Sequence, residues 1–352
     1  MPMRVGLVLG AGGSVGAAWL IGALDALESE TGWRSCEAER IVGTSAGSAV
    51  GALIAQGYPP ALMAAYAGGE ALDDVADAEH RALLAKERIE TNAFHLQRAL
   101  PPIGPGSWRL ALSTLRAPHR HNASAVLAGW LPRGFVSTAP IRRLIEQFVP
   151  AGWPQHDGYW AVAADYATGR RVAFGHDDAA TANIAQAVAA SCCIPGFYHP
   201  VKIGGRRYVD GGICSPSNLD LLCGEGLDLV VCLNPMSSPV GVLKGGSATD
   251  RLSAVLRAAN GRRVGYEARK LRESGTPVLI LHPGADDCSL MGLNLMRGER
   301  RVAVTEQARR SVARDVRRLR SQGELLPGAV RRRVPVAPAR RAPRPAQARR
   351  AA

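Results

Sequence analysis

The sequence has no apolar run long enough to cross a bilayer as a helix. Apolar runs such as residues 50–55 and 278–281 are far shorter than the roughly 18 residues that a spanning helix needs. It also has no charged leader followed by an apolar stretch and a small-residue cleavage site, because a strand-like run begins at residue 4. These absences favour a cytoplasmic protein in which any contact with a membrane is peripheral, at the inner face.

Paired cysteines are missing as well. No two cysteines form a C-x-x-C pair, and their number is odd: Cys36, Cys192, Cys193, Cys214, Cys223, Cys232 and Cys288. This pattern argues against a disulfide framework and against a zinc site. We expect reduced thiols in the core, no metal and no cofactor.

Acidic residues are scarce at the end of the chain, which explains the formal net charge of +13. Residues 1–296 contain 26 basic and 26 acidic side chains, so the excess positive charge lies entirely after them. Nucleic-acid binding is not expected from these arginines, because no aromatic residues are interleaved among them.

The basic end divides into two parts. Residues 297–326 predict a basic helix with one apolar stripe. The stripe consists of Ala308, Val312, Val316 and Leu319. Residues 327–352 are mainly Arg, Pro, Ala and Val without a helical or strand period, which predicts a disordered tail. This region is either a core-packed helix with a solvated tail, or an Arg-rich surface that docks on anionic membrane.

Strand-like runs alternate with helical patterns through most of residues 1–320. The strand-like runs lie at residues 5–9, 41–42, 229–233 and 278–281, and helical patterns follow at residues 15–27, 46–56, 252–271 and 300–320. Such alternation predicts an α/β fold, a three-layer α/β/α sandwich with a mostly parallel central sheet. We expect one large domain over residues 1–296.

Three stretches interrupt this alternation. Residues 61–135 are rich in Ala and Leu but broken by prolines, which predicts a helical insertion. Residues 160–174 and 201–209 alternate around glycine-containing turns and predict two β-hairpins.

A serine lies between a predicted strand and a predicted helix, in the sequence Gly43-Thr44-Ser45-Ala46-Gly47. This G-x-S-x-G pattern is typical of a nucleophile elbow, where the serine occupies a strained turn and the glycines relieve crowding. The helix N-terminus favours negative charge that develops there. The alternative interpretation is a glycine-rich turn in which Ser45 only caps the helix.

A glycine-rich segment, residues 10–16, follows the first predicted strand and opens the first helix. Its motif residues are Gly10, Gly12, Gly13, Ser14 and Gly16. One interpretation of such a segment is a dinucleotide site, but the third glycine of that fingerprint falls on Val15, and no acidic residue stands at the expected ribose position. The amides around Gly12, Gly13 and Ser14 instead predict an oxyanion hole.

Asp210 precedes Gly211 and Gly212 at the end of the second predicted hairpin. Asp before two glycines often forms only an Asx-turn. The alternative is a base for Ser45, because a serine hydrolase needs a group that accepts the nucleophile's proton. His282 is the one histidine C-terminal to Asp210 and leaves a conventional Ser-Asp-His triad open. Without it, Asp210 must take the proton directly.

These motifs stand in a recognisable order. The glycine-rich segment, the serine turn, the Asp-Gly-Gly turn and the segment Ala-Ser-Cys-Cys-Ile-Pro-Gly-Phe at residues 190–197 together resemble the patatin-like phospholipases, over residues 4–235. The sequence departs from that family at Ala11, where a glycine is usual, and at Val15, where a basic residue is usual.

The resemblance implies a serine lipid-acyl hydrolase that forms an acyl-enzyme intermediate. Ser45 would be the nucleophile, Asp210 the base, and Gly12 and Gly13 the oxyanion donors. The substrate would be a phospholipid or another acyl ester, and no cofactor is implied. Two alternatives remain: a conventional esterase that uses His282, and a non-catalytic lipid-binding protein with the same fold.

Overall fold

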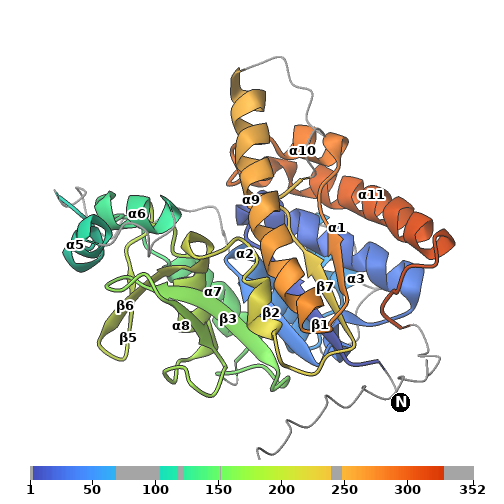
Figure 1. The fold of residues 1–352 in the computed structure, drawn as a ribbon, viewed down its shortest axis with the longest axis horizontal. Coiled ribbons are helices and arrows are strands. Elements are labelled where there is room, and N and C mark those ends of the chain that lie inside the picture. Colours follow the sequence, from blue (N-terminus) through green and yellow to red (C-terminus); the bar gives the residue numbers. More distant parts are fainter. Residues whose placement is uncertain (1–2, 69–103, 117–122, 151, 239–247, 329–352) are drawn as a thin grey trace, which may run out of the picture.

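The structure is a computed structural model, and it describes residues 3–68, 104–116, 123–150, 152–238 and 248–328 (Figure 1). Most of the predicted tail and the middle of the predicted insertion therefore lie outside the described residues. Eight strands within these ranges form one sheet. They are β1 (Val5–Leu9), β2 (Arg40–Thr44), β3 (Tyr159–Asp165), β4 (Arg171–Phe174), β5 (Val201–Ile203), β6 (Arg206–Asp210), β7 (Leu229–Leu233) and β8 (Val278–Leu281).

The sheet is mixed and mostly parallel along its centre. Its order is β5-β6-β3-β2-β1-β7-β8, with β4 paired to β3 outside this path. Strands β3, β2, β1, β7 and β8 run parallel to one another, whereas the β3–β4, β3–β6 and β5–β6 pairs are antiparallel. Both predicted hairpins are therefore present, as β3–β4 and β5–β6.

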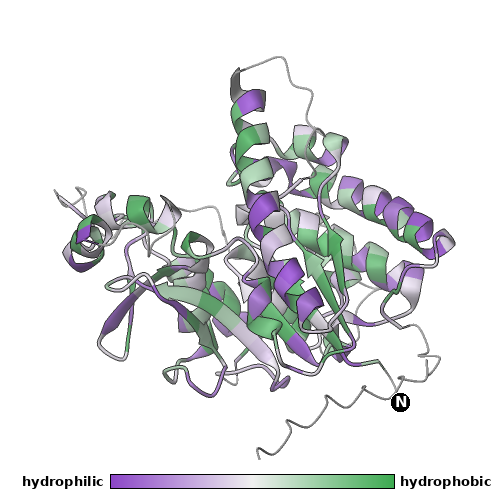
Figure 2. Cartoon of the chain, viewed as in Figure 1, coloured by the Kyte–Doolittle hydropathy of each residue, from purple (hydrophilic) through white to green (hydrophobic). Residues whose placement is uncertain are grey.

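Helices cover both faces of the sheet, which confirms the predicted three-layer fold. The helices are α1 (Gly13–Thr31), α2 (Ala46–Ala55), α3 (Pro60–Gly68), α5 (Trp108–Arg116), α6 (Ala123–Trp130), α7 (Ala139–Phe148), α8 (Ile184–Ser191), α9 (Ala248–Glu273), α10 (Ala285–Met291) and α11 (Arg301–Ser321). Because side chains alternate along a strand, Leu7 and Leu9 point into the core shared with α1 and α11, and Val8 points toward α9. The central strands β1 and β7 are hydrophobic and fully buried (Figure 2), as expected where helices cover both faces of a sheet.

Helix α11 packs along α1, and both helices contribute to the same hydrophobic core. Its stripe residues Ala308, Val312 and Val316 are buried, which matches the core-packed interpretation of the basic helix. Its exposed face is hydrophilic in Figure 2. Two arginines on this face pair with acids of α1, Arg309 with Asp25 at 2.7 Å and Arg317 with Glu30 at 2.7 Å. No helix of the described residues is long and apolar enough to span a membrane.

Candidate active site

Ser45 occupies a strained turn between β2 and α2. Its backbone has φ 53° and ψ −121°, a left-handed conformation that residues with a side chain rarely adopt. The flanking glycines make this turn possible. A Cβ on Gly43 would lie 2.5 Å from the carbonyl oxygen of Gly47, and a Cβ on Gly47 would collide with the carbonyl oxygen of Leu9. The G-x-S-x-G pattern is therefore a steric requirement of this turn.

Hydrogen bonds from two other serines hold the turn. The amide of Ser45 donates to the hydroxyl of Ser191 at 2.9 Å, and that hydroxyl donates to the carbonyl of Val162 at 2.6 Å. The hydroxyl of Ser48 donates to the carbonyl of Ser45 at 2.6 Å. These bonds leave the backbone of Ser45 little freedom to relax out of its strained conformation.

Asp210 lies at the end of β6, next to Ser45. Its carboxylate accepts a hydrogen bond from the amide of Gly212 at 2.7 Å, and the side chain of Ser45 lies close enough to lower the pKa of the carboxyl. The side chain therefore forms the predicted Asx-type turn and also contacts the serine. Asp210 is 6% exposed, and burial raises the pKa of its carboxyl to about 6, although the Ser45 side chain and the Gly212 amide oppose this shift.

The glycine-rich segment lies beside this pair. Strand β1 pairs in parallel with β2, with Leu9 opposite Gly43, so the segments that follow the two strands emerge side by side. Ala11 also approaches the turn after Asp210, since its Cβ lies 3.8 Å from a Cβ built on Gly212. Three motif segments far apart in the sequence thus meet where β1, β2 and β6 end.

Helix α1 begins within this segment, at Gly13. Gly13 has φ 60°, and a Cβ there would lie 2.8 Å from the carbonyl oxygen of Leu295, so a glycine is needed. The amide of Val15 donates to the same carbonyl at 2.9 Å. Within the described part of the chain, the amides of Gly12, Gly13 and Ser14 donate to no protein acceptor.

The two departures from the family pattern have different surroundings. Ala11 is partly exposed, and its amide donates to the carbonyl of Pro216 at 2.8 Å. Val15 is fully buried within the hydrophobic core around α1. A basic side chain in this backbone position would have to find a charged partner in that core, so Val15 suits its surroundings here.

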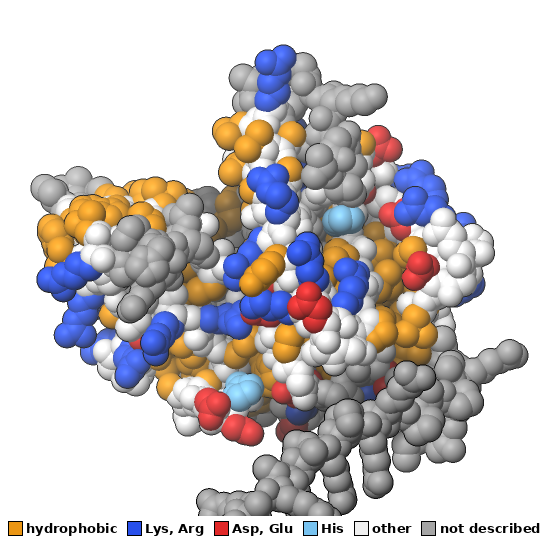
Figure 3. Space-filling view, viewed as in Figure 1, with side chains coloured by type: hydrophobic (Ala, Val, Ile, Leu, Met, Phe, Trp, Pro, Cys, Tyr) orange, Lys and Arg blue, Asp and Glu red, His pale blue; other side chains and the backbone are white. Residues whose placement is uncertain are grey.

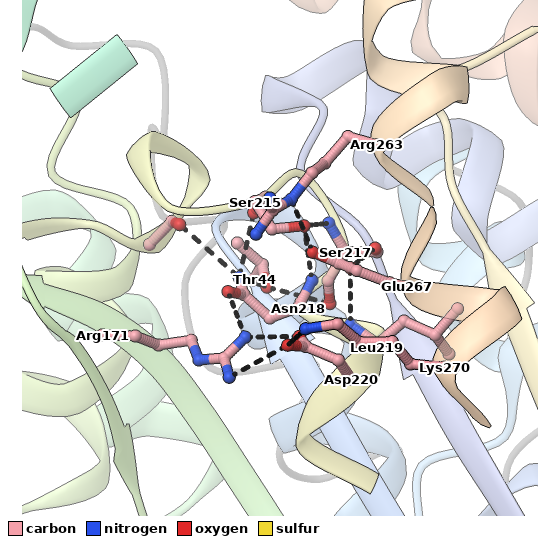
Figure 4. Close-up of polar contacts among 11 residues, drawn as sticks. Thr44, Arg171, Ser215, Ser217, Asn218, Leu219, Asp220, Arg263, Glu267 and Lys270 are labelled. Atoms are coloured by element: carbon pink, nitrogen blue, oxygen red, sulfur yellow. Dashed lines mark hydrogen bonds and ion pairs between the residues drawn. The ribbon is translucent and has the colours of Figure 1, made fainter. Parts of the chain in front are cut away.

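A buried polar network under the turns was not predicted from the sequence (Figure 4). At its centre lies Asn218, which is fully buried and has φ 54°. Its side-chain amide donates to the hydroxyl of Thr44 at 3.0 Å, to the carbonyl of Ser215 at 2.9 Å and to the carbonyl of Gly211 at 3.5 Å. Thr44 precedes Ser45 and Gly211 follows Asp210, so Asn218 links the two segments that carry the candidate site.

Helix α9 closes the other side of this network. The carboxylate of Glu267, which is fully buried, accepts from the hydroxyl of Ser217 at 2.8 Å and from the amide of Leu219 at 3.1 Å. Arg263 pairs with the same carboxylate at 2.9 Å. The segment that contains Asn218 is therefore fixed between the sheet and α9 (Figure 4).

His282 lies away from Ser45. It follows β8, and the sheet order places β7 and β1 between β8 and β2. Three inter-strand steps correspond to about 14 Å, beyond hydrogen-bond reach of Ser45. Burial lowers the pKa of the His282 imidazole, and Asp315 is the one charged group that opposes this shift. This geometry argues against a conventional triad.

A metal site is not found in the described ranges. No group of three or more His, Cys, Asp or Glu side chains among these residues gathers where it could hold a metal ion.

The fold and the comparison with known families agree. The α/β fold, with its mixed, mostly parallel sheet flanked by helices, is consistent with the patatin fold. The model of the patatin-like phospholipase family matches residues 7–222, and the chain belongs to this family. Proteins of this family are generally acyl hydrolases.

One solved structure with a match to the chain is the crystal structure of the type III effector protein ExoU. The sequences are 18% identical, the TM-score is 0.34, and the match covers 90% of this chain and 53% of ExoU. The chain thus corresponds to about half the length of that protein.

Proposed function

We propose that the chain hydrolyses the ester bonds of phospholipids or related lipid acyl esters, with Ser45 as nucleophile and Asp210 as its base. The observation that carries the proposal is the proximity of Ser45 to the buried carboxylate of Asp210. Asn218 bonds to Thr44, beside Ser45, and to Gly211, beside Asp210, and the Ser45 side chain lowers the pKa of the Asp210 carboxyl. The strained turn adds support, because such strain is common where a nucleophile must project from a strand-to-helix junction.

Acylation begins when Ser45 Oγ attacks the ester carbonyl carbon. The Asp210 carboxylate accepts the serine proton as the new C–O bond forms, and the carbonyl electrons move onto oxygen. The free amides of Gly12, Gly13 and Ser14 donate to this oxyanion. As the tetrahedral intermediate collapses, the bond to the alcohol breaks, and protonated Asp210 returns the proton to the leaving oxygen.

Deacylation repeats these steps with water. Asp210 accepts a proton from water, which attacks the acyl carbonyl, and returns it to Ser45 Oγ when the acid leaves. A carboxyl with a pKa of about 6 suits both roles, because it is ionised at neutral pH and is a stronger base than an exposed carboxylate.

We also propose a division of the chain into three parts. Residues 1–296 form the catalytic domain, with the insertion at 61–135, and residues 297–326 form a basic helix that packs on it. The tail, residues 327–352, adds positive charge that favours anionic membrane. The packing of α11 on α1 supports the position of the helix in this scheme.

The test is covalent labelling of the full chain with a fluorophosphonate, followed by mass spectrometry, beside an ester panel of varied chain length and head group. We expect label on Ser45 only, and loss of labelling and turnover in Ser45→Ala and Asp210→Asn. Asp165→Asn is the matched control, because Asp165 is also buried but caps the β3–β4 turn through the amides of Ala167 and Thr168. It should retain activity. An unlabelled Ser45 in a folded protein without turnover would favour the non-catalytic lipid-binding alternative.

A further inference from the structure

Helix α5 has two apolar faces, and only one of them is buried. Leu110 and Ala111 are fully buried. Leu110 belongs to a small hydrophobic cluster, and α5 packs against α6. On the other face, Trp108, Leu112 and Leu115 are 60%, 43% and 63% exposed. Their spacings of four and three residues place them on one stripe of the helix. A nine-residue helix that exposes such a stripe has a surface suited to an apolar environment.

Helix α6 extends this surface. Leu127 and Trp130, three residues apart, are 59% and 42% exposed, whereas Ala125 and Ala128 are buried. Figure 3 shows hydrophobic side chains gathered over α5 and α6, with Lys and Arg side chains along the border. We call the exposed side chains of these two helices the α5–α6 surface: Trp108, Leu112, Leu115, Leu127 and Trp130.

Charge around the α5–α6 surface has one sign. Residues 104–116 and 123–139 contain Arg109, Arg116 and Arg133 but no Asp or Glu. Arg109 and Arg116 are exposed and flank the apolar stripe of α5. This combination of apolar, indole and cationic groups matches the acyl chains, interface and phosphates of an anionic lipid surface.

The first half of α9 offers a second surface of the same kind. Leu252, Val255 and Leu256 are 54%, 63% and 50% exposed and lie on one face of the helix. Arg251 and Arg262 are exposed nearby, and residues 251–266 contain no acid. This half of α9 projects above the body of the molecule, and its upper turns are largely hydrophobic (Figures 1 and 2).

Both surfaces are connected to the candidate active site. Helix α6 contacts the turn Gly211–Ile213, which directly follows Asp210. On the other side, Arg257 of α9 is buried and donates to the carbonyl of Pro235 at 2.7 Å. The ring of Pro235 packs against Gly12, since a Cβ there would lie 2.7 Å from it. The two surfaces therefore border the site on the side of the base and on the side of the oxyanion loop.

We propose that the α5–α6 surface and the exposed face of α9 dock together on an anionic phospholipid bilayer, with the candidate active site between them. That the docked site cleaves lipid rests on the proposed function, whereas docking itself does not. Helix α11 contrasts with both surfaces, because Ala308, Val312 and Val316 of its apolar stripe are buried and its exposed apolar side chain Val302 stands alone among charged residues. Apolar insertion therefore belongs to α5, α6 and α9.

The test measures vesicle binding separately from hydrolysis. The full chain is co-sedimented with vesicles of phosphatidylcholine alone and of phosphatidylcholine with phosphatidylglycerol, at low and high salt. The variant Leu112→Ser/Leu115→Ser/Leu127→Ser should bind the mixed vesicles about tenfold more weakly or worse, because each exposed leucine loses apolar contact. The control Val302→Ser/Leu325→Ser changes side chains that are 41% and 37% exposed elsewhere, and should bind like the unmodified chain.

Hydrolysis of a soluble short-chain ester is measured in parallel. We expect the triple variant to keep this activity and to lose activity on vesicles. Equal vesicle binding by the triple variant and the control would overturn the proposal. It would also be overturned if the unmodified chain and the control formed a stable dimer and the triple variant were a monomer, since a second copy of the chain would then occupy the surface. Ser45→Ala should lose soluble-ester turnover but bind vesicles like the unmodified chain, and this variant tests the catalytic assignment alone. Failure of the docking proposal and failure of the proposed function are therefore distinguishable.

Discussion

Replacing Asp210 with Asn should stabilise the folded protein while abolishing turnover. Burial raises the pKa of this carboxyl from 3.8 to about 6, so folding an ionised Asp210 at neutral pH carries a free-energy cost. One pKa unit corresponds to about 1.36 kcal/mol, so a shift of roughly two units costs about 3 kcal/mol. Asn is isosteric and neutral, and it can still accept from the amide of Gly212, so it avoids this cost.

The sign of the pH dependence follows from the same shift. Below pH 3.8 the carboxyl is protonated in both the folded and the unfolded chain, so Asp210 lowers stability little there. The loss of stability grows as pH rises toward about 6 and is constant above it. The free energy of unfolding, from urea titration at pH 4.5 and pH 8, should therefore differ between Asp210→Asn and the unmodified chain mainly at pH 8.

Two further results would check this reasoning. The kcat/KM of the unmodified chain on a soluble ester should rise with pH through about 6 and then level off, because the ionised carboxylate is the base. Asp165→Asn removes a different buried carboxylate that caps a turn, and should not stabilise the protein. An Asp210→Asn variant no more stable at pH 8 than at pH 4.5, relative to the unmodified chain, would refute the argument.

Seven other substitutions, at five positions, give contrasting expectations. Ser45→Gly and Ser45→Ala should both be inactive, but Ser45→Gly should be about 1 kcal/mol more stable than Ser45→Ala by urea unfolding, because only Gly relieves φ 53°. Gly47→Ala should lower stability by about 3 kcal/mol or more, because the new methyl group would collide with the carbonyl of Leu9. Gly265→Ala should be neutral or stabilising, because Gly265 lies in the middle of α9 and a Cβ there meets no other atom within 4 Å. Asn218→Gly and Asn218→Ala should each lower kcat more than they raise KM, and lose about 1–3 kcal/mol of stability through unpaired buried groups. His282→Ala should retain kcat/KM on a soluble ester, and a loss comparable to that of Ser45→Ala would revive the triad.

The local parts of the fold and site were predictable because short stretches of sequence determine them. The alternation of strand and helix patterns predicted the layered α/β fold, and glycine spacing located the turns at Ser45 and Asp210. A G-x-S-x-G turn between a strand and a helix has few steric solutions, so its pattern is informative without knowledge of the rest of the chain.

Contacts between distant segments were not predictable in the same way. Ser191 and Asn218 lie 146 and 174 residues from the groups of the serine turn that they contact. Ser191 belongs to the segment 190–197 that resembles the family, but that pattern does not indicate its contact with Ser45, and no local pattern marks Asn218. The exposed stripe of α5 was also missed, because a short helix with apolar residues on two faces looks like a buried helix until its neighbours are known. Side-chain partners across a sheet depend on strand order, which the alternation alone leaves open.

The geometry of the site explains why these distant contacts matter. Positive φ at Ser45 and a buried carboxylate at Asp210 each lower stability, so an unsupported pair would relax by rotating the turn or admitting water. Ser191 fixes the amide of Ser45, and Asn218 fixes the residues next to both members of the pair. Neither needs to touch substrate to affect rate, because each keeps the hydroxyl and the carboxylate within hydrogen-bond reach. The contacts in the rest of the sheet and in the network under the turns therefore hold Ser45 and Asp210 in an arrangement that would be unfavourable by itself.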